Sequence, residues 1–206
     1  MTRKPISTRE VIRQSLHFVK GDTVDLGAGT AKYRHLIKPL TKKYVTFDKF
    51  PGPNIDVVGD ILNLPFASSS FDTAIATQVL EHVKKPWVMV SEIARILRPG
   101  GVCIISAPFM VPYHTDPDDY FRYTTSGLRS LAEDAGLETL ECLSYGGLAG
   151  VLSEIIHFRF FNPYGKPLSK WRQRFFRYWE RSALFLDKWL QSKIAYPNAY
   201  IVAKKK

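Results

Sequence analysis

Residues 23–31, TVDLGAGTA, decide the fold, because a short apolar strand runs directly into a glycine turn and the helical stretch 32–40 follows. A strand that ends in glycines and restarts as a helix brings bare backbone N–H groups and a helix N-terminus together. Those groups suit a small polar or anionic ligand. A Gly-x-Gly turn also occurs as an ordinary tight connection, so its meaning depends on its spacing.

The spacing of the glycines separates this turn from the dinucleotide-binding turn. Dinucleotide binders use Gly-x-Gly-x-x-Gly, whose last glycine lets the helix pack close to the strand. Here that position is Lys32, and the nearest small residue, Ala31, comes one place too early. With the acid Asp25 in front, the turn is better suited to a ligand that carries both an ammonium group and a carboxylate, as an aminoacyl tail does.

Further strand candidates follow the turn. The second strand ends in Asp48, about twenty residues past the glycines, where a carboxylate can accept hydrogen bonds from both ribose hydroxyls. The fifth is continuously apolar, as expected of a strand buried on both faces. The expected elements are strands 43–48, 55–59, 70–78 and 102–108, with a helix over 79–97.

Five ordered blocks resemble the class I S-adenosylmethionine-dependent methyltransferases, in particular the type 11 group of small-molecule enzymes. The blocks are VDLGAGTA (24–31), Asp48, GDILNLPFASSSFD (59–72), QVLEHV (78–83) and RILRPGGVCIISAPF (95–109). They cover about half of the chain at compatible spacing, so the series is more specific than any single block. The chain departs from the pattern at Ala31, where the family often has glycine, and the added methyl predicts a tolerable crowding of the turn.

The resemblance implies an α/β fold with a Rossmann-like, seven-stranded, mostly parallel sheet flanked by helices. The last strand, 199–203, is expected to be antiparallel at the edge. A methyltransferase core would comprise residues 1–145 plus 196–206, and residues 146–195 would form a helical insertion or lid before the last strand.

The resemblance also implies S-adenosyl-L-methionine as the cofactor and assigns residues to it. The backbone of Gly27, Ala28 and Gly29 would face the methionine part. Asp25 would orient the loop or receive the ammonium group through water, and Gln78 would offer its backbone carbonyl to the same group.

The remaining cofactor candidates concern the sugar and the base. Asp48, with its neighbour Lys49, would hold the ribose, and Asp60 with Ile61 would meet the adenine edge and face. Each also has a structural interpretation, because Asp60 could cap a helix, Asp48 could form a turn and Ile61 could belong to the core.

The polar, proline-rich loop 107–124 leaves the carboxyl end of a buried strand, where open α/β sheets place their ligands. His114 is the first candidate for a general base, because the ordinary pKa of histidine lies close to working pH. Tyr120 and Arg122 are candidates beside it. In the structural alternative, the aspartates of this loop build turns and Arg122 pairs with one of them. No metal is expected, because the His-x-Asp-x-Asp cluster lacks a completing set of ligands.

His82, in the run LEHV, is the second candidate base. It could reach the methyl-transfer site from the start of the helix, or it could satisfy local backbone groups.

Composition places most of the excess positive charge in one region. The net charge of +10 lies mainly after residue 157, and two cysteines sit in apolar strand candidates, as in a reducing compartment. No signal peptide or membrane-spanning run is apparent, which predicts the cytoplasm or its inner membrane face. Basic charge fits nucleic acid, acidic lipid, an acidic substrate or plain solubility.

The segment 146–195 predicts two helices, 148–161 and 169–193. The second helix carries aromatic residues near helical spacing, with basic residues on its other faces. It matches a lid whose apolar stripe packs on the domain, and it also matches a peripheral membrane helix. The aromatic residues of the stripe, with two leucines, are Trp171, Phe175, Tyr178, Trp179, Leu186 and Leu190.

The resulting hypothesis is methyl transfer to a small-molecule acceptor that is amphipathic or lipid-linked. A nucleic-acid partner is disfavoured, because residues 76–78 replace the Asn/Asp-Pro-Pro-Tyr/Phe clamp and no Pro-Cys nucleophile appears. A third class is a cofactor-binding module without catalysis.

Overall fold

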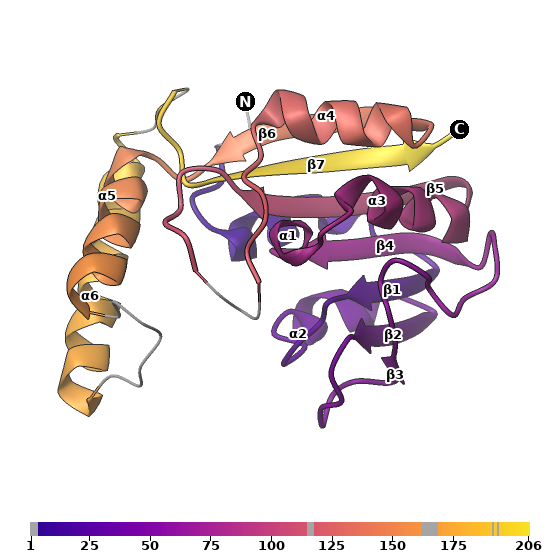
Figure 1. Cartoon of the computed structure of the whole chain (residues 1–206), viewed down its shortest axis with the longest axis horizontal. Helices are drawn as coiled ribbons and strands as arrows, with labels where there is room; N and C mark the ends of the chain where they lie inside the picture. The colour runs from indigo at the N-terminus through magenta and orange to yellow at the C-terminus, as the bar shows by residue number, and fades with distance from the viewer. Residues whose placement is uncertain (1–3, 115–117, 162–168, 191, 193) are drawn as a thin grey trace.

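A single mixed sheet organises the molecule in this computed structural model, which describes residues 4–114, 118–161, 169–190, 192 and 194–206 (Figure 1). In the described chain the strand order is β3-β2-β1-β4-β5-β7-β6. The strands are β1 Asp22–Leu26, β2 Lys43–Asp48, β3 Val57–Val58, β4 Phe71–Thr77, β5 Leu97–Pro108, β6 Leu137–Tyr145 and β7 Asn198–Lys205.

The direction of the strands confirms the Rossmann-like arrangement. Strands β1 to β5 pair in parallel, and β7 pairs antiparallel with both β5 and β6. The prediction that the last strand lies at the edge is wrong, because β7 is inserted between β5 and β6. Residues 199–203 are buried on both faces, which suits an inner strand, whereas β6 alternates with exposed side chains and suits the edge.

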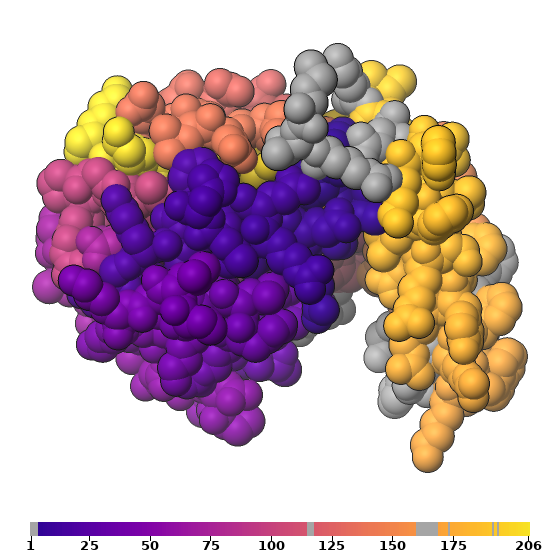
Figure 2. All heavy atoms as spheres, turned by 180° about the vertical axis from the view of Figure 1, so that it is seen from behind, coloured from indigo at the N-terminus to yellow at the C-terminus, as the bar shows by residue number. Residues whose placement is uncertain are grey.

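Helices cover both faces of the sheet. On one face, α3 (Pro86–Ile96) and α4 (Thr125–Asp134) contribute Ile93 and Leu128 to the larger core cluster. On the other face, α1 (Thr8–Ser15) and the short α2 (Arg34–Ile37) contribute to a second cluster. Figure 2 shows this second face, with the N-terminal segment in indigo spread across it.

Strand β5 joins the two halves of the core. Cys103 and Ile105 belong to the cluster on one face, while Val102 and Ile104 belong to the cluster on the other. The predicted burial of this strand on both faces is therefore confirmed, and both cysteines of the chain are free thiols.

Several predicted boundaries in the core differ from the structure. The strand expected over 55–59 is reduced to β3, and the helical stretch 32–40 consists of α2 and a 3-10 turn, Lys38–Leu40. The expected helix over 79–97 is split into a 3-10 turn, Leu80–His82, and α3, because the residue before Pro86 is disfavoured in a helix and proline prefers the first turn. Strand β5 also begins earlier than expected, at Leu97, with a register irregularity opposite β4 that accommodates the glycines 100 and 101.

The predicted insertion contains a helical hairpin. Helix α5 (Leu148–Ile156) continues into a π-helical turn, His157–Phe161, and α6 spans Lys170–Asp187, six residues shorter than predicted at its C-terminal end. Predicted residues 162–168, 191 and 193 lie outside the described ranges. In Figures 1 and 2 the hairpin stands at one end of the molecule, and much of its length projects past the sheet.

The packing face of the hairpin separates the two interpretations of its aromatic stripe. Ala183 and Asp187 are buried, and the Phe176 ring lies against that of His157 at 39°, with centroids 3.8 Å apart. The aromatic stripe is exposed, with Trp171 69% and Tyr178 58% accessible, which does not match a stripe packed on the domain. Within the described ranges, no helix combines the length and the apolarity that crossing a bilayer requires.

Candidate functional site

The glycine turn after β1 uses a conformation that requires glycine. Gly27 and Gly29 have φ angles of +66° and +53°, in the left-handed region that side chains disfavour. A Cβ at Gly27 would also lie 2.4 Å from Cγ2 of Val79. The turn therefore brings its backbone close to the start of the chain segment that follows β4.

Ala31 departs from the expected crowding in an informative way. Its φ angle is +54°, so this non-glycine residue adopts the left-handed conformation itself. Alanine at this position therefore carries a cost in its backbone conformation. A strained residue two positions after Gly29 fits a turn whose shape is maintained for ligand binding.

A cavity of about 770 Å³ opens beside this turn, at the carboxyl ends of β1, β2 and β4. A cavity of this size accommodates a nucleoside-sized ligand. The predicted cofactor residues that line it are Gly27, Gly29, Asp48, Lys49, Asp60, Ile61 and Gln78. The structure thus brings seven of the nine candidates to one cavity, and their individual roles remain predictions.

The two acids in the cavity wall also have structural contacts. Asp48 accepts hydrogen bonds from the backbone N–H of Gly29 (2.9 Å) and of Phe50 (3.1 Å), which tie the end of β2 to the glycine turn. Asp60 accepts one from the N–H of Leu62 at 2.9 Å, a local turn contact. The structural and the cofactor-binding interpretations of these residues are therefore compatible.

The other two cofactor candidates, Ala28 and Asp25, do not line the cavity. The N–H of Ala28 donates to the carbonyl of Phe47 at 3.1 Å, which joins the turn to β2. Asp25 is buried, and the hydroxyl of Tyr44 donates to its Oδ2 at 2.5 Å. The pKa of Asp25 is raised to about 6, mainly because the carboxyl is buried. The hydrogen bond from Tyr44 lowers this pKa, and the charge of Asp48 contributes to raising it.

Gln78 ends β4 with a strained backbone, at a φ angle of +56°. Its side-chain Nε2 donates to Oγ of Ser106 (3.2 Å) and to Oη of Tyr145 (3.1 Å). These bonds hold the side chain against β5 and β6, so the turn of the chain at Gln78 is fixed where it borders the cavity.

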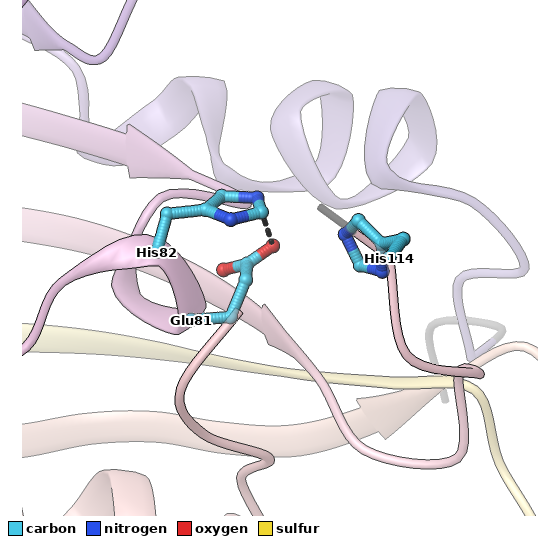
Figure 3. A group of neighbouring side chains, drawn as sticks. All are labelled: Glu81, His82 and His114. Atoms are coloured by element: carbon cyan, nitrogen blue, oxygen red, sulfur yellow. Dashed lines mark ion pairs between the residues drawn. The ribbon is translucent and has the colours of Figure 1, made fainter. Parts of the chain in front are cut away.

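His82 and His114 meet beside the cavity, although they come from distant parts of the chain. Their rings are 5.3 Å apart in an edge-to-face arrangement, and His82 also lines the cavity (Figure 3). Nδ1 of His82 lies 2.5 Å from the carbonyl oxygen of Asp118, and Nδ1 of His114 lies 3.1 Å from that of Pro112. The predicted catalytic histidines are therefore neighbours, with His82 nearer to the cofactor cavity.

Arg122 holds the loop that carries His114. Its guanidinium donates to both oxygens of Asp119 and to the carbonyls of Val111 and Pro112. Burial raises the pKa of Asp119, but the hydrogen bonds from Arg122 and from the N–H of His114 outweigh it and leave the pKa lowered. The structural alternative for Arg122 matches these contacts, while the fourth candidate, Tyr120, lines the cavity.

Two residues near the histidines are missing from the sequence-based set. Glu81 is buried next to His82, and desolvation raises its pKa to about 7. The sequence signal that could have identified Glu81 is an acidic residue inside the apolar run 79–83. Phe158 of the hairpin lies 5.8 Å from the His114 ring, centroid to centroid. No sequence signal could have found that contact, because it depends on how the insertion folds back.

Comparison with known proteins finds a family to which the central part of the chain is similar. Residues 24–105 match the family described as a methyltransferase domain. A Mycolicibacterium smegmatis protein, named as a probable S-adenosylmethionine-dependent methyltransferase, is 28% identical over 165 residues, which cover 69% of this chain and 62% of that protein. Relatives of higher identity match over 17–38% of their own length. The chain thus spans less than two thirds of these relatives.

Solved structures share the fold at low identity. A SAM-dependent methyltransferase from Archaeoglobus fulgidus superposes with a TM-score of 0.63 at 16% identity, over 96% of this chain and 92% of that one. The [4+2]-cyclase SpnF superposes with a TM-score of 0.61 at 17% identity, over 95% and 78% of the two chains. At these identities the likeness shows the fold alone, and the two neighbours have different names for their reactions.

Proposed function

We propose that this chain, whose residues 24–105 match the methyltransferase-domain family, transfers a methyl group from S-adenosylmethionine to a small amphipathic or lipid-linked acceptor. The observation that carries the proposal is the single cavity that joins the glycine turn, the acids at the ends of β2 and β3, and His82.

The residues around the cavity fit S-adenosylmethionine, the cosubstrate that the family and the fold imply. The glycine turn offers backbone N–H groups to an amino-acid carboxylate, Asp48 can accept hydrogen bonds from ribose hydroxyls, and Ile61 offers an apolar surface to a base. When bound, the cosubstrate supplies a methyl group on a sulfonium, which is a good leaving group.

The task left to the protein is placement of the acceptor in line with the methyl group and exclusion of water. Orientation of this kind can lower a barrier by roughly 7–11 kcal/mol. A hydroxyl acceptor must also lose its proton as the new bond forms. We assign that proton to Nε2 of His82, because its Nδ1 faces the Asp118 carbonyl and the ring borders the cavity. His114, the first candidate from sequence, lies behind it.

The surface of the hairpin supports an amphipathic acceptor. Large apolar side chains of α6 are exposed beside basic ones, and Trp189, just past the helix, is 81% accessible. An aromatic and basic helix of this kind binds the surface of an anionic bilayer. Phe158 of the same hairpin approaches His114, so an acceptor held at the membrane surface would lie near the site. The basic residues are Lys170, Arg174, Arg177, Arg181 and Lys188.

The experiment that tests the proposed function combines binding with turnover. Calorimetry should detect S-adenosylhomocysteine binding to the wild-type chain, and mass spectrometry should detect a gain of one methyl group on an acceptor from a panel of amphipathic alcohols, phenols and amines. Absence of binding heat on folded protein would overturn the whole proposal. Binding without transfer to any acceptor would instead support a module that holds the cofactor without catalysis.

A further inference from the structure

The geometry points to a divalent transition-metal site made by Glu81, His82 and His114, with the ion facing the acceptor end of the cavity. Zn²⁺ and Mn²⁺ are the chemical class, because two imidazoles and one carboxylate suit such ions. The ion's use in catalysis rests on the proposed function, whereas its binding does not.

The three side chains converge on one point. One ligand atom from each lies within 4.8 Å of the other two, and Figure 3 shows the Glu81 carboxylate directed between the two rings. Nε2 of His82 is 3.7 Å from Oε1 of Glu81. Ligands that share a zinc ion at ~2.1 Å lie about 3.4 Å from each other. The ligand atoms therefore need to approach one another by up to about 1.4 Å to hold an ion.

The rings of both histidines are already oriented for metal binding. Each Nδ1 faces a backbone carbonyl, that of Asp118 for His82 and that of Pro112 for His114. A ring that donates its Nδ1–H to a carbonyl keeps the lone pair of Nε2 for a ligand bond. This second hydrogen bond is the usual support of a metal-binding histidine.

The carboxylate of Glu81 gives an independent indication. The side chain is 1% exposed, and its Oε2 has no hydrogen-bond partner among the residues that the structure describes. A buried carboxylate oxygen without a partner is costly. Since the oxygen that faces Nε2 of His82 is Oε1, a cation compensates Oε2 by binding both oxygens of the carboxylate. The nearby guanidinium of Arg122 does not supply this compensation, because it is bound to Asp119 and to loop carbonyls.

The position of the ion suits the proposed reaction. His82 lines the cofactor cavity while Glu81 and His114 lie behind it, so the open coordination positions would face the cavity. A hydroxyl bound there would be polarised and would lose its proton more readily to solvent in the cavity. With the ion bound, Nε2 of His82 is a ligand, so it takes the acceptor's proton only in the ion-free protein. Three protein ligands with an open position are also the pattern of catalytic rather than structural metal sites.

The test measures metal binding apart from turnover. Untagged full-length protein, stripped with a chelator, is titrated with Zn²⁺ by calorimetry and with Co²⁺ by visible absorption. We expect one ion per chain and d–d bands of a low-coordinate site. Glu81→Gln and His114→Ala should each weaken binding at least 10-fold. His35→Ala, which removes an exposed histidine on α2, should leave it unchanged.

The same samples are titrated with S-adenosylhomocysteine, and circular dichroism checks their folding. Cofactor binding without uptake of either ion would overturn the metal site and leave the proposed function intact. Metal uptake without cofactor binding would support the metal site and overturn the proposed function. Equal Zn²⁺ affinity in wild type and folded Glu81→Gln would show that the ion binds elsewhere, which also overturns the site.

Discussion

The glycine turn and the α5–α6 hairpin are held in opposite ways. The turn is bonded on both sides, through Ala28 to β2 and through Gly29 to Asp48, and it lies beside strands that are buried on both faces. Among its described residues, the hairpin exposes most of its large side chains. A rigid sheet edge suits precise placement of a cofactor, whereas a loosely attached arm suits an acceptor of variable shape.

Gly27→Ala should have the largest effect on the glycine turn and on its affinity for the cofactor. The new Cβ would lie 2.4 Å from Val79, and the φ angle of +66° would be strained. We expect affinity for S-adenosylhomocysteine to fall roughly 100-fold or more, about 3 kcal/mol, in calorimetry. Gly100→Ala is the matched control, with a φ angle of +76° but open space around its Cβ. Similar affinity losses in the two variants would contradict the close approach at Gly27.

The buried acid beneath the turn predicts a pH dependence of stability. Burial raises the pKa of Asp25 from 3.8 to about 6, so the folded state holds the proton more tightly than the unfolded state. Its contribution is therefore most favourable below about pH 4 and is lost as the pH rises through about 6, by at most roughly 3 kcal/mol. Denaturant unfolding of wild type and Asp25→Asn between pH 4 and 7 measures this difference. Parallel pH profiles would exclude Asp25 as the group responsible.

The hairpin should be broken by Asp187→Ala. Its buried carboxylate accepts hydrogen bonds from the N–H groups of Gly147, Ala149 and Gly150, at 2.8 to 2.9 Å, and so caps the start of α5 from α6. We expect about 2 kcal/mol less protection of α5 and α6 in hydrogen exchange, with cofactor affinity unchanged. Asp187→Asn keeps one acceptor oxygen, so it should lose less hydrogen-exchange protection than Asp187→Ala. An equal loss of protection in the core strands would show that the two regions unfold together.

The exposed aromatics of the hairpin allow a milder test. Replacing Trp171 and Trp189 by alanine should reduce binding to phosphatidylglycerol-containing vesicles about 10-fold, close to 1.4 kcal/mol, while circular dichroism stays unchanged. Trp87→Ala is the control, because Trp87 is 53% exposed but lies on α3 of the core. If the control lost as much vesicle binding, the hairpin would not be the contact surface.

The smallest expected effect is a change in stability at Ala31, in the glycine turn. Ala31→Gly removes a side chain from a residue at a φ angle of +54°, and should stabilise the fold by about 1 kcal/mol in thermal unfolding. Ser69→Gly, at a φ angle of +53° on a surface turn, provides a comparison away from the cavity. A loss of stability in Ala31→Gly would show that the methyl group contributes packing that outweighs the strain.

Sequence patterns predicted the core better than the hairpin. The strands of the core follow from local chemistry, because continuous apolar runs such as that of β5 mark strands buried on both faces. The position of β7 does not, because strand order depends on which neighbours bury its apolar run. The packing face of α6 stayed open between a packed lid and a membrane contact, since helical spacing marks a stripe but does not say whether a partner covers it.

The amino-acid sequence by itself determined the glycine turn, the acids at the strand ends and the resemblance to class I methyltransferases, because each of these depends on residues close together in the chain. Only the tertiary structure brought Glu81 and His82, after β4, against His114 in the loop after β5. Convergence of that kind depends on β4 and β5 lying side by side with both loops at the same edge. The metal-binding geometry is therefore a property of the sheet and not of any single segment.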